Sequence, residues 1–242
     1  MKAITILENE FKKNHANANE ELKVLLERKL KHCYATLKIA SSIFSLSQAQ
    51  KDMLLLHDIG RFNQFEDSAT YSHAVFGSEL LKGRGFDIEV VLPIKYHETD
   101  IDWQRHILND SDYVNLPDEK KRAVLFNTAL LKDIDIIANM EEQVGGKVTP
   151  SKRINPIVLN NLSNGAICDS RSDVRGEVDR ILYILCGLFV INLDESKRYI
   201  NKKRIARRLF DKANKSVAGC PKMQESIYKS RVLVYNTLKW LH

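Results

Sequence analysis

The chain has 242 residues, of which 44% are hydrophobic and 28% are charged; this composition is typical of a globular protein with a sizeable core and excludes a disordered tail protein or a collagen. Its 37 Lys and Arg residues and 31 Asp and Glu residues give a net charge of +6, which is unevenly spread. Residues 51–150 contain 11 basic and 18 acidic residues, whereas residues 201–242 contain 11 basic and 2 acidic residues. We expect the acidic middle to attract cations and the basic end to attract phosphates.

The sequence predicts neither a membrane span nor an export signal. The longest apolar stretch, residues 181–193, is shorter than the roughly 20 residues that a membrane helix needs. The charged N-terminal residues include no apolar block of signal-peptide length, so we expect a cytoplasmic protein without membrane contact. The four cysteines form no CxxC pair and are expected to be reduced thiols: Cys33, Cys168, Cys186 and Cys220.

Apolar residues recur at steps of three and four, which predicts an all-α fold. The first long helix is expected from about Asn19 to about Phe44, with His32 on its apolar face. Ser47 and Gln50 form a capping-box pattern that begins a second helix, and Gly60 is interpreted as a signal that stops it. The doublet His57 and Asp58 then lies at the end of that helix.

Three further helices are expected in the middle of the chain. They cover residues 72–81, residues 88–97, and a long segment that begins at Pro117 and runs to about Met140. Pro93 is expected either to kink the second of these or to belong to its first turn.

Glycine, proline, asparagine and serine are concentrated in residues 145–176, which predicts a long loop that could cover a site as a lid. Arg171 and Arg175 in this loop could close over a nucleotide phosphate. Helices are expected beyond it over residues 177–193, 197–215 and 221–241. We predict a single domain over residues 1–242, with a metal-binding core at about residues 19–141, an irregular lid at 145–176 and basic C-terminal helices at 177–242.

Several histidines and aspartates lie on these predicted helices beside apolar residues. A single histidine on an apolar face is more often a structural residue than a ligand. Together, however, His32, the His57–Asp58 doublet and an aspartate of the fifth helix form a mixed nitrogen and oxygen set. Such a set suits a divalent metal, namely Mn, Fe, Co, Ni, Zn or Mg.

The order of these residues resembles the HD-domain metal-dependent phosphohydrolases, an all-helical superfamily named for its His-Asp doublet. The resemblance covers roughly residues 25–141. It rests on five segments in order: KHCYATLKIA at residues 31–40, LLLHDIGRF at 54–62, YSHAVFGSELL at 71–81, IKYHE at 94–98 and LLKDIDIIANM at 130–140.

The resemblance implies that His32, His57, Asp58 and an aspartate of the last helix ligate one divalent metal. Periodicity alone does not choose between Asp133 and Asp135, because residues two apart on a helix face different directions. The family's Lys-x-x-Asp arrangement favours Asp135. It also leaves Lys132 nearby as a phosphate contact and substrate-binding residue.

The resemblance leaves open whether one or two metals bind. In binuclear members, histidines at the places of His73 and His97 bind a second metal and the doublet aspartate, here Asp58, bridges both ions. In mononuclear members, equivalent histidines contact the substrate phosphate or transfer a proton. No GYP segment follows IKYHET, so the chain is similar to a bacterial HDIGRF-type subgroup and not to the HD-GYP proteins, and the resemblance supplies no substrate.

Fixed cations near the metal would stabilise the negative charge that develops on a phosphoryl group. Arg61 follows Asp58 by three residues and could bind phosphate through two parallel hydrogen bonds, so we count it with Asp58, His73 and His97 as catalytic residues. Lys95 is a weaker candidate. Glu98 is expected either to orient His97 or to form an ordinary exposed pair.

We therefore predict a metal-dependent phosphohydrolase that acts on a nucleotide or a related small phosphorylated molecule, as a monoesterase or a diesterase. The alternative is an HD-fold binding module that keeps its metal and contacts nucleic acid through the basic helix at residues 197–215. We do not favour nucleic acid as a partner at this point, and a homo-oligomer is left open. A metal-dependent oxygenase on the same scaffold is a third alternative.

Overall fold

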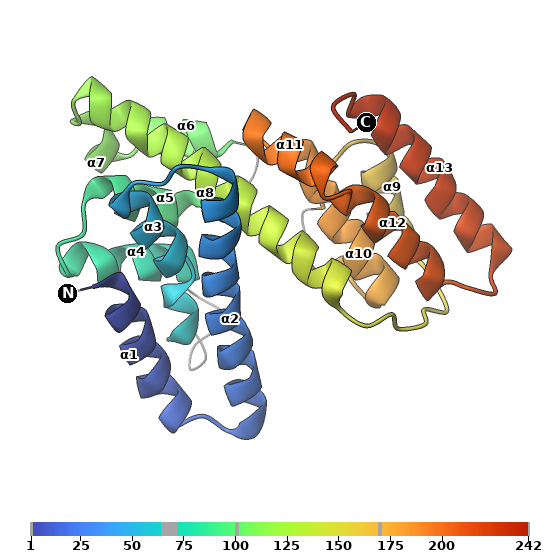
Figure 1. Cartoon of the computed structure of the whole chain (residues 1–242), viewed down its shortest axis with the longest axis horizontal. Coiled ribbons are helices and arrows are strands. Elements are labelled where there is room, and N and C mark those ends of the chain that lie inside the picture. The colour runs from blue at the N-terminus through green and yellow to red at the C-terminus, as the bar shows by residue number, and fades with distance from the viewer. Residues whose placement is uncertain (1, 64–71, 100–101, 169–170, 242) are drawn as a thin grey trace. The chain divides into compact units, whose positions relative to one another are not determined.

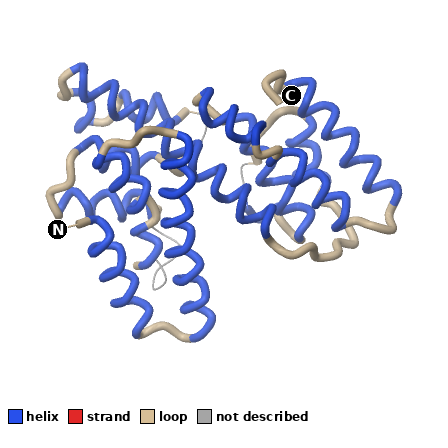
Figure 2. Tube along the Cα trace, viewed as in Figure 1, coloured by secondary structure: helices blue, strands red, loops and turns tan. Residues whose placement is uncertain are grey.

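The computed structural model describes residues 2–63, 72–99, 102–168 and 171–241, and every regular element within them is a helix (Figure 1, Figure 2). The all-α prediction is therefore confirmed. The chain divides into two compact units, Met1–Asp135 and Ile136–His242. No described helix combines the length and the apolar character that a bilayer span requires.

The described residues of the first unit form a series of helices. They are α1 (Ala3–Ala16), α2 (Glu20–Ile43), α3 (Gln48–Leu56), the 3-10 helix η1 (Ile59–Phe62), α4 (His73–Gly83), α5 (Ile88–Tyr96), α6 (Trp103–Leu108), α7 (Ser111–Val114) and most of α8 (Asp118–Gly145). The expected start signals operate here. The Asn19 side chain accepts a hydrogen bond from the backbone N–H of Leu22, and Ser47 forms a complete capping box with Gln50.

Three helices of this unit were not expected from periodicity, namely α1, α6 and α7. Helix α1 buries Ile6 and Leu7 and packs against α2, α3 and η1. Pro93 lies inside α5 rather than in its first turn, where it removes one backbone donor from a helix that is buried along most of its length.

The second unit contains the end of α8 and the remaining helices. These are α9 (Pro156–Ser163), η2 (Arg171–Asp173), α10 (Glu177–Cys186), η3 (Gly187–Val190), α11 (Asp194–Lys202), α12 (Ile205–Ser216) and α13 (Pro221–Thr237). Helix α10 packs against both α9 and α12, and buried aliphatic side chains such as Ile181 and Leu209 fill the space between them. Cys168 and Cys186 lie here as unbridged thiols with their Sγ atoms 3.6 Å apart, as the prediction of reduced cysteines requires.

The segment predicted as an irregular loop, residues 145–176, contains the regular helix α9. Asn155 is its N-cap, accepting from the backbone N–H of Ile157, and Pro156 occupies the first helical position. The glycines and asparagines around this start signal dominate the composition, which is why composition alone does not predict α9. The closing of this segment over a nucleotide through Arg171 and Arg175 stays a prediction.

The basic helix predicted over residues 197–215 is two helices. Helix α11 ends at Lys202, α12 begins at Ile205, and Arg204 between them has a left-handed backbone with φ = 53°. Helical periodicity continues on both sides of this break, so apolar spacing alone could not reveal it.

The single-domain prediction for residues 1–242 also stays a prediction. Each of the two units has its own buried core, which is typical of two domains. Helix α8, however, is one continuous helix that passes the boundary between Asp135 and Ile136, which is typical of one.

Candidate metal centre

Four buried histidines of the first unit come from four different helices or helix ends. His32 lies in the middle of α2, His57 is the C-cap of α3, His73 is the first residue of α4 and His97 is the C-cap of α5. A side chain at the end of a helix can project past the helix into the interior of the unit. Helix ends are therefore suitable positions for side chains that converge on one centre.

One group of possible ligands consists of His32, His57 and Asp135. The Nε2 atom of His32 lies 2.8 Å from Oδ1 of Asp135, and Nε2 of His57 lies 3.7 Å from the same oxygen. Two ligands that bind one ion at right angles, each about 2.1 Å away, lie about 3 Å apart, so these spacings fit an ion. Asp133 belongs to neither ligand group among the described residues, so the geometry favours Asp135.

A second group consists of Asp58, His73 and His97. Oδ1 of Asp58 lies 2.9 Å from Nε2 of His73 and 3.9 Å from Nε2 of His97, and the two imidazole nitrogens are 3.3 Å apart. The other oxygen, Oδ2, lies 3.8 Å from Nε2 of His57 in the first group. The two oxygens of Asp58 thus face different ligand groups.

Hydrogen bonds on the far side of the rings fix the imidazoles. Nδ1 of His57 donates to the Leu54 carbonyl at 2.9 Å, and Nδ1 of His97 donates to the Ile94 carbonyl at 2.7 Å. A carbonyl oxygen can only accept, so each Nδ1 carries a proton, and each Nε2 points toward the centre, where it offers its lone pair when the ring is neutral. Nε2 of His57 is fully buried and has no hydrogen-bond partner among the described residues. A buried nitrogen of this kind is expected where an ion binds.

Glu98 anchors His73 rather than His97, which corrects the expectation from its sequence position. Its Oε2 lies 2.8 Å from Nδ1 of His73 and accepts from the Ser72 hydroxyl at 3.0 Å, while Oε1 accepts from Arg61 at 2.9 Å. Burial acts to raise the pKa of Glu98, but the hydrogen bond and charge of His73, with Arg61, lower it to about 2. Glu98 is therefore a carboxylate at neutral pH.

Lys29 is a functional candidate that the sequence analysis did not select. It lies one helical turn before His32 on α2, and its Nζ is 2.9 Å from Oδ2 of Asp58. The signal was its place three residues before His32 on the apolar face of the predicted helix. A lysine at this spacing is usually solvated, so only the packing of α2 against the doublet identifies it.

The other expected cations are engaged in different ways. Nε of Arg61 lies 3.6 Å from Oδ1 of Asp58, in addition to the contact with Glu98. Nζ of Lys132 is buried and donates to the carbonyls of His97 and Thr99 at the end of α5. Lys95 pairs with Asp110 at 2.6 Å.

The two aspartates of the centre are held ionised. Burial acts to raise the pKa of Asp58, but the charge of His57, the hydrogen bonds of His73 and His97 and the charge of Lys29 hold it well below its usual range. The pKa of Asp135 is likewise well below its usual range, because His32 and His57 outweigh the effect of burial. Ionised carboxylates and neutral imidazole nitrogens are the forms that bind a divalent metal.

Gly60 brings η1, and with it the doublet, close to α4. A Cβ atom at this position would collide with the carbonyl oxygen of His73 and would lie 2.9 Å from the backbone nitrogen of Gly77. Its φ is not positive, so its role is close approach and not the left-handed helix stop that the sequence suggested. The missing side chain places His73 next to Asp58.

The donor set of these two groups fits divalent metals. Histidine nitrogen and carboxylate oxygen suit Mn, Fe, Co, Ni and Zn, and the shared Asp58 suits two adjacent ions. Residues 30–140 match the family model of the HD domain. Comparisons with curated proteins and with solved structures gave no match. Residues 30–140 of the chain therefore form an HD domain, the domain that the ordered histidines and aspartates of the sequence resemble.

Proposed function

We propose that the protein is a divalent-metal-dependent phosphohydrolase whose substrate is a phosphate ester of a nucleotide or a related small molecule. The observation that carries this proposal is Asp58, whose two carboxylate oxygens face two separate groups of ligands. The HD domain over residues 30–140 supports the same class of reaction.

We propose that two ions bind. His32, His57, Asp58 and Asp135 would hold the first, and Asp58, His73 and His97 would hold the second. When bound, divalent ions lower the pKa of coordinated water and polarise the phosphoryl group, which makes hydrolysis feasible at neutral pH. The Nδ1 hydrogen bonds hold the imidazole rings of His57 and His97 in place, which would reduce the reorganisation that metal binding requires.

Arg61 and Lys29 are the cations best placed to bind the substrate phosphate. Both lie against Asp58, and their side chains are 21% and 31% exposed, so each can reach solvent at the edge of the centre. Lys132 has a different role in this proposal. Because its Nζ holds the carbonyls that follow α5, it positions His97 rather than the substrate.

The proposal is tested by metal content and by hydrolysis of two generic esters. Protein purified without chelator should contain two ions of Mn, Fe, Co, Ni or Zn per chain by mass spectrometry, and should hydrolyse bis(p-nitrophenyl) phosphate or p-nitrophenyl phosphate. Asp58→Ala should lose both ions and the activity, because the two carboxylate oxygens of Asp58 would serve both proposed metal sites. Asp52→Ala on α3 is the matched control and should keep both.

The outcomes separate the alternatives. One ion per chain overturns the second metal site and makes His73 and His97 candidates for phosphate contact or proton transfer. Absence of any ion after incubation with each metal overturns the enzymatic proposal and leaves a binding module. A coloured, redox-active di-iron centre without esterase activity indicates an oxygenase instead.

A further inference from the structure

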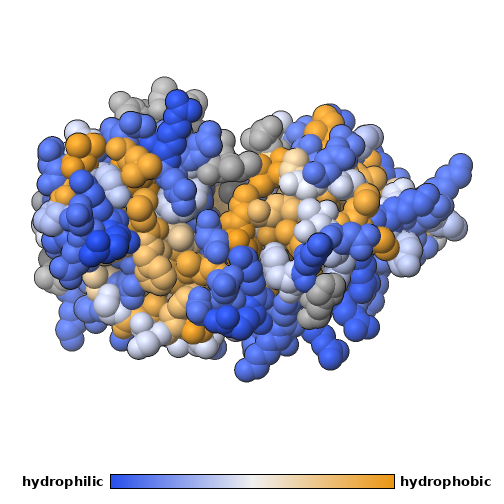
Figure 3. Space-filling model, turned by 90° about the horizontal axis from the view of Figure 1, so that it is seen from above, coloured by the Kyte–Doolittle hydropathy of each residue, from blue (hydrophilic) through white to orange (hydrophobic). Residues whose placement is uncertain are grey.

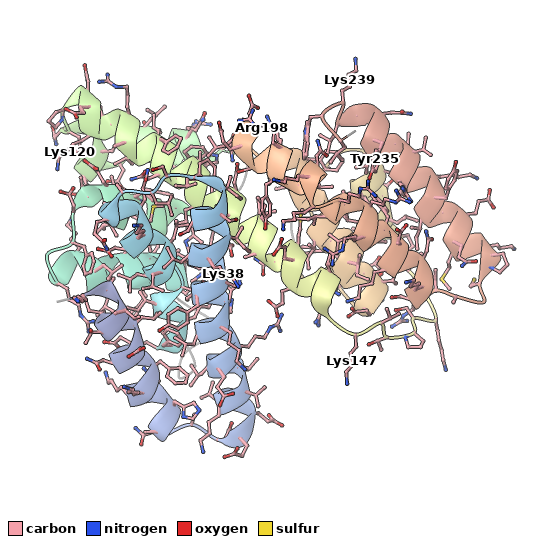
Figure 4. The ribbon with its side chains drawn as sticks, in the orientation of Figure 1. Lys38, Lys120, Lys147, Arg198, Tyr235 and Lys239 are labelled. Atoms are coloured by element: carbon pink, nitrogen blue, oxygen red, sulfur yellow. The ribbon has the colours of Figure 1, made fainter. Side chains whose placement is uncertain are left out.

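The second unit carries the positive charge of this protein. Residues 136–242 contain 19 Lys and Arg residues and 10 Asp and Glu residues, whereas residues 1–135 contain 18 and 21. The excess is concentrated at the junction of α11 and α12, where Arg198, Lys202, Lys203, Arg204, Arg207, Arg208 and Lys215 are all exposed. Figure 4 labels Arg198, whose side chain points away from its helix.

Packing explains why these cations are exposed. Ile200, Ile205, Leu209 and Phe210 are buried, so the apolar sides of α11 and α12 are used by the core of the second unit. The charged sides face solvent. Lys212 is the exception, since it is buried and holds the carbonyls of Gln143 and Gly146 at the end of α8.

Several of these cations lack a compensating carboxylate. Arg198 pairs with Glu195 and Arg207 lies 3.9 Å from Asp211. Within the described part of the chain, by contrast, no carboxylate lies within ion-pair distance of Lys202, Lys203, Arg204 or Arg208. Four like charges within seven residues repel one another, and a bound anion would relieve that repulsion.

The backbone at the centre of this cluster is also strained. Arg204 has φ = 53°, a conformation that costs energy for any residue with a Cβ atom and is normally taken by glycine or asparagine. A glycine there would remove the strain but also the charge. The strained conformation brings the cations of α11 and α12 to one junction.

The chemistry of the surface discriminates between classes of anionic partner. Helices that bind membranes insert large apolar side chains between the lipids. None of the large hydrophobic side chains that are exposed in the described chain lies between residues 194 and 216. On the face shown in Figure 3, hydrophobic residues gather in bands between hydrophilic areas. Protein partners generally need an apolar or aromatic centre as well. A chain of regularly spaced phosphates needs only cations.

We propose that the α11–α12 junction, Lys202, Lys203, Arg204 and Arg208, binds the sugar-phosphate backbone of a nucleic acid. This surface is independent of the metal centre and of the proposed hydrolysis. Binding should be weakly dependent on base sequence, because cations on phosphates carry no base information. If four phosphates of a single strand are contacted, a plot of the logarithm of the association constant against the logarithm of the salt concentration should have a slope of about −3.

The test is fluorescence anisotropy with a fluorescein-labelled poly(U) oligonucleotide, at salt concentrations from about 50 to about 200 mM. The full chain is used in the presence of a chelator, so that the probe is not hydrolysed. The triple variant Lys202→Glu, Lys203→Glu, Arg208→Glu should lose at least about tenfold in affinity. The control is Lys147→Glu, Lys222→Glu, Lys239→Glu, which changes the net charge equally at exposed positions of the same unit and should lose less than about threefold.

Two further measurements make the result decisive, and circular dichroism checks that each variant is folded. Asp58→Ala should bind the oligonucleotide as tightly as the native chain, and loss of binding in that variant would move the nucleic-acid site to the metal centre. Sedimentation with phosphatidylserine vesicles should show no binding. The proposal is overturned if the native chain does not bind the oligonucleotide at the lowest salt, if both triple variants lose affinity equally, or if the vesicles bind and the oligonucleotide does not.

Discussion

Glu98 shows how a residue outside the ligand set can control a metal ligand. Its carboxylate holds Nδ1 of His73 at 2.8 Å, and a pKa of about 2 keeps it negative at any neutral pH. A negative group behind an imidazole fixes the ring and raises the basicity of the nitrogen on the other side. Glu98 thus acts on the second ligand group through His73, without belonging to either ligand group itself.

Glu98→Gln should weaken metal binding while leaving the helices intact. The amide can still contact His73 but carries no charge, so we expect the affinity for the second ion to fall by about 10- to 100-fold. Calorimetric titration of the chelator-treated protein with Mn²⁺ measures this change. Glu89→Gln, which alters a carboxylate at the start of α5 beside Lys120, serves as the control. Equal affinities in the two variants would contradict the positioning role.

The tight packing of η1 against α4 determines the geometry of the centre at the scale of elements. Gly60 and Gly77 lie where the two backbones meet, and Ile59 of η1 packs against Gly77. Asp58 precedes η1 and His73 begins α4. The distance of 2.9 Å between Oδ1 of Asp58 and Nε2 of His73 therefore depends on the contact between these two elements.

Gly60→Ala should push the two elements apart. The added methyl group has no space at the His73 carbonyl, and overpacking of this kind costs about 1–3 kcal/mol of unfolding free energy. Metal affinity should fall in parallel, because the Asp58–His73 spacing changes. Urea unfolding and metal titration test both expectations.

Gly83→Ala is the matched control for that variant. A Cβ atom at Gly83 meets nothing within 4 Å and its φ is not positive, so this change should stabilise α4 by about 0.5–1 kcal/mol. If Gly60→Ala were as stable as Gly83→Ala, the close approach of η1 and α4 would not be the reason for the glycine.

Helices with both an apolar stripe and a cap were predicted close to their observed bounds. Helices α2 and α3 are examples, because Asn19 and the Ser47–Gln50 pair mark their starts in the sequence. Short helices such as α6 and α7 contain too few turns to show a period. The break at Arg204 has no local signal, since arginine rarely adopts the left-handed backbone that it has here.

At the scale of the whole molecule, charge and chemistry are divided between the two units. The first holds all the candidate metal ligands and has an excess of acidic residues, and the second has the excess of basic residues. The HD domain match, residues 30–140, covers most of the first unit and only the first residues of the second. The metal centre and the basic surface can therefore be tested by separate variants.

Metal binding should stabilise the folded chain, because the ligands come from residues 32–135 and converge only when the first unit is folded. An ion present at about 100 times its Kd should add about 2.7 kcal/mol to the unfolding free energy. Thermal unfolding of chelator-treated protein, with and without Mn²⁺, measures the effect. In Asp58→Ala, Mn²⁺ should raise the unfolding temperature much less. An equal increase in that variant would show that the stabilising ion binds elsewhere.

The sequence by itself determined the all-α class, the start signals of the long helices and the ordered set of histidines and aspartates that resembles an HD domain. These features are local, since a period, a cap or a motif is complete within a few turns of chain. Only the tertiary structure decided that Asp135 rather than Asp133 lies beside His32, that Asp58 faces two groups, and that Lys29 and Glu98 contact the centre. Each of these contacts joins residues from different helices, and the distance between such residues depends on how the helices pack, which spacing along the chain does not specify.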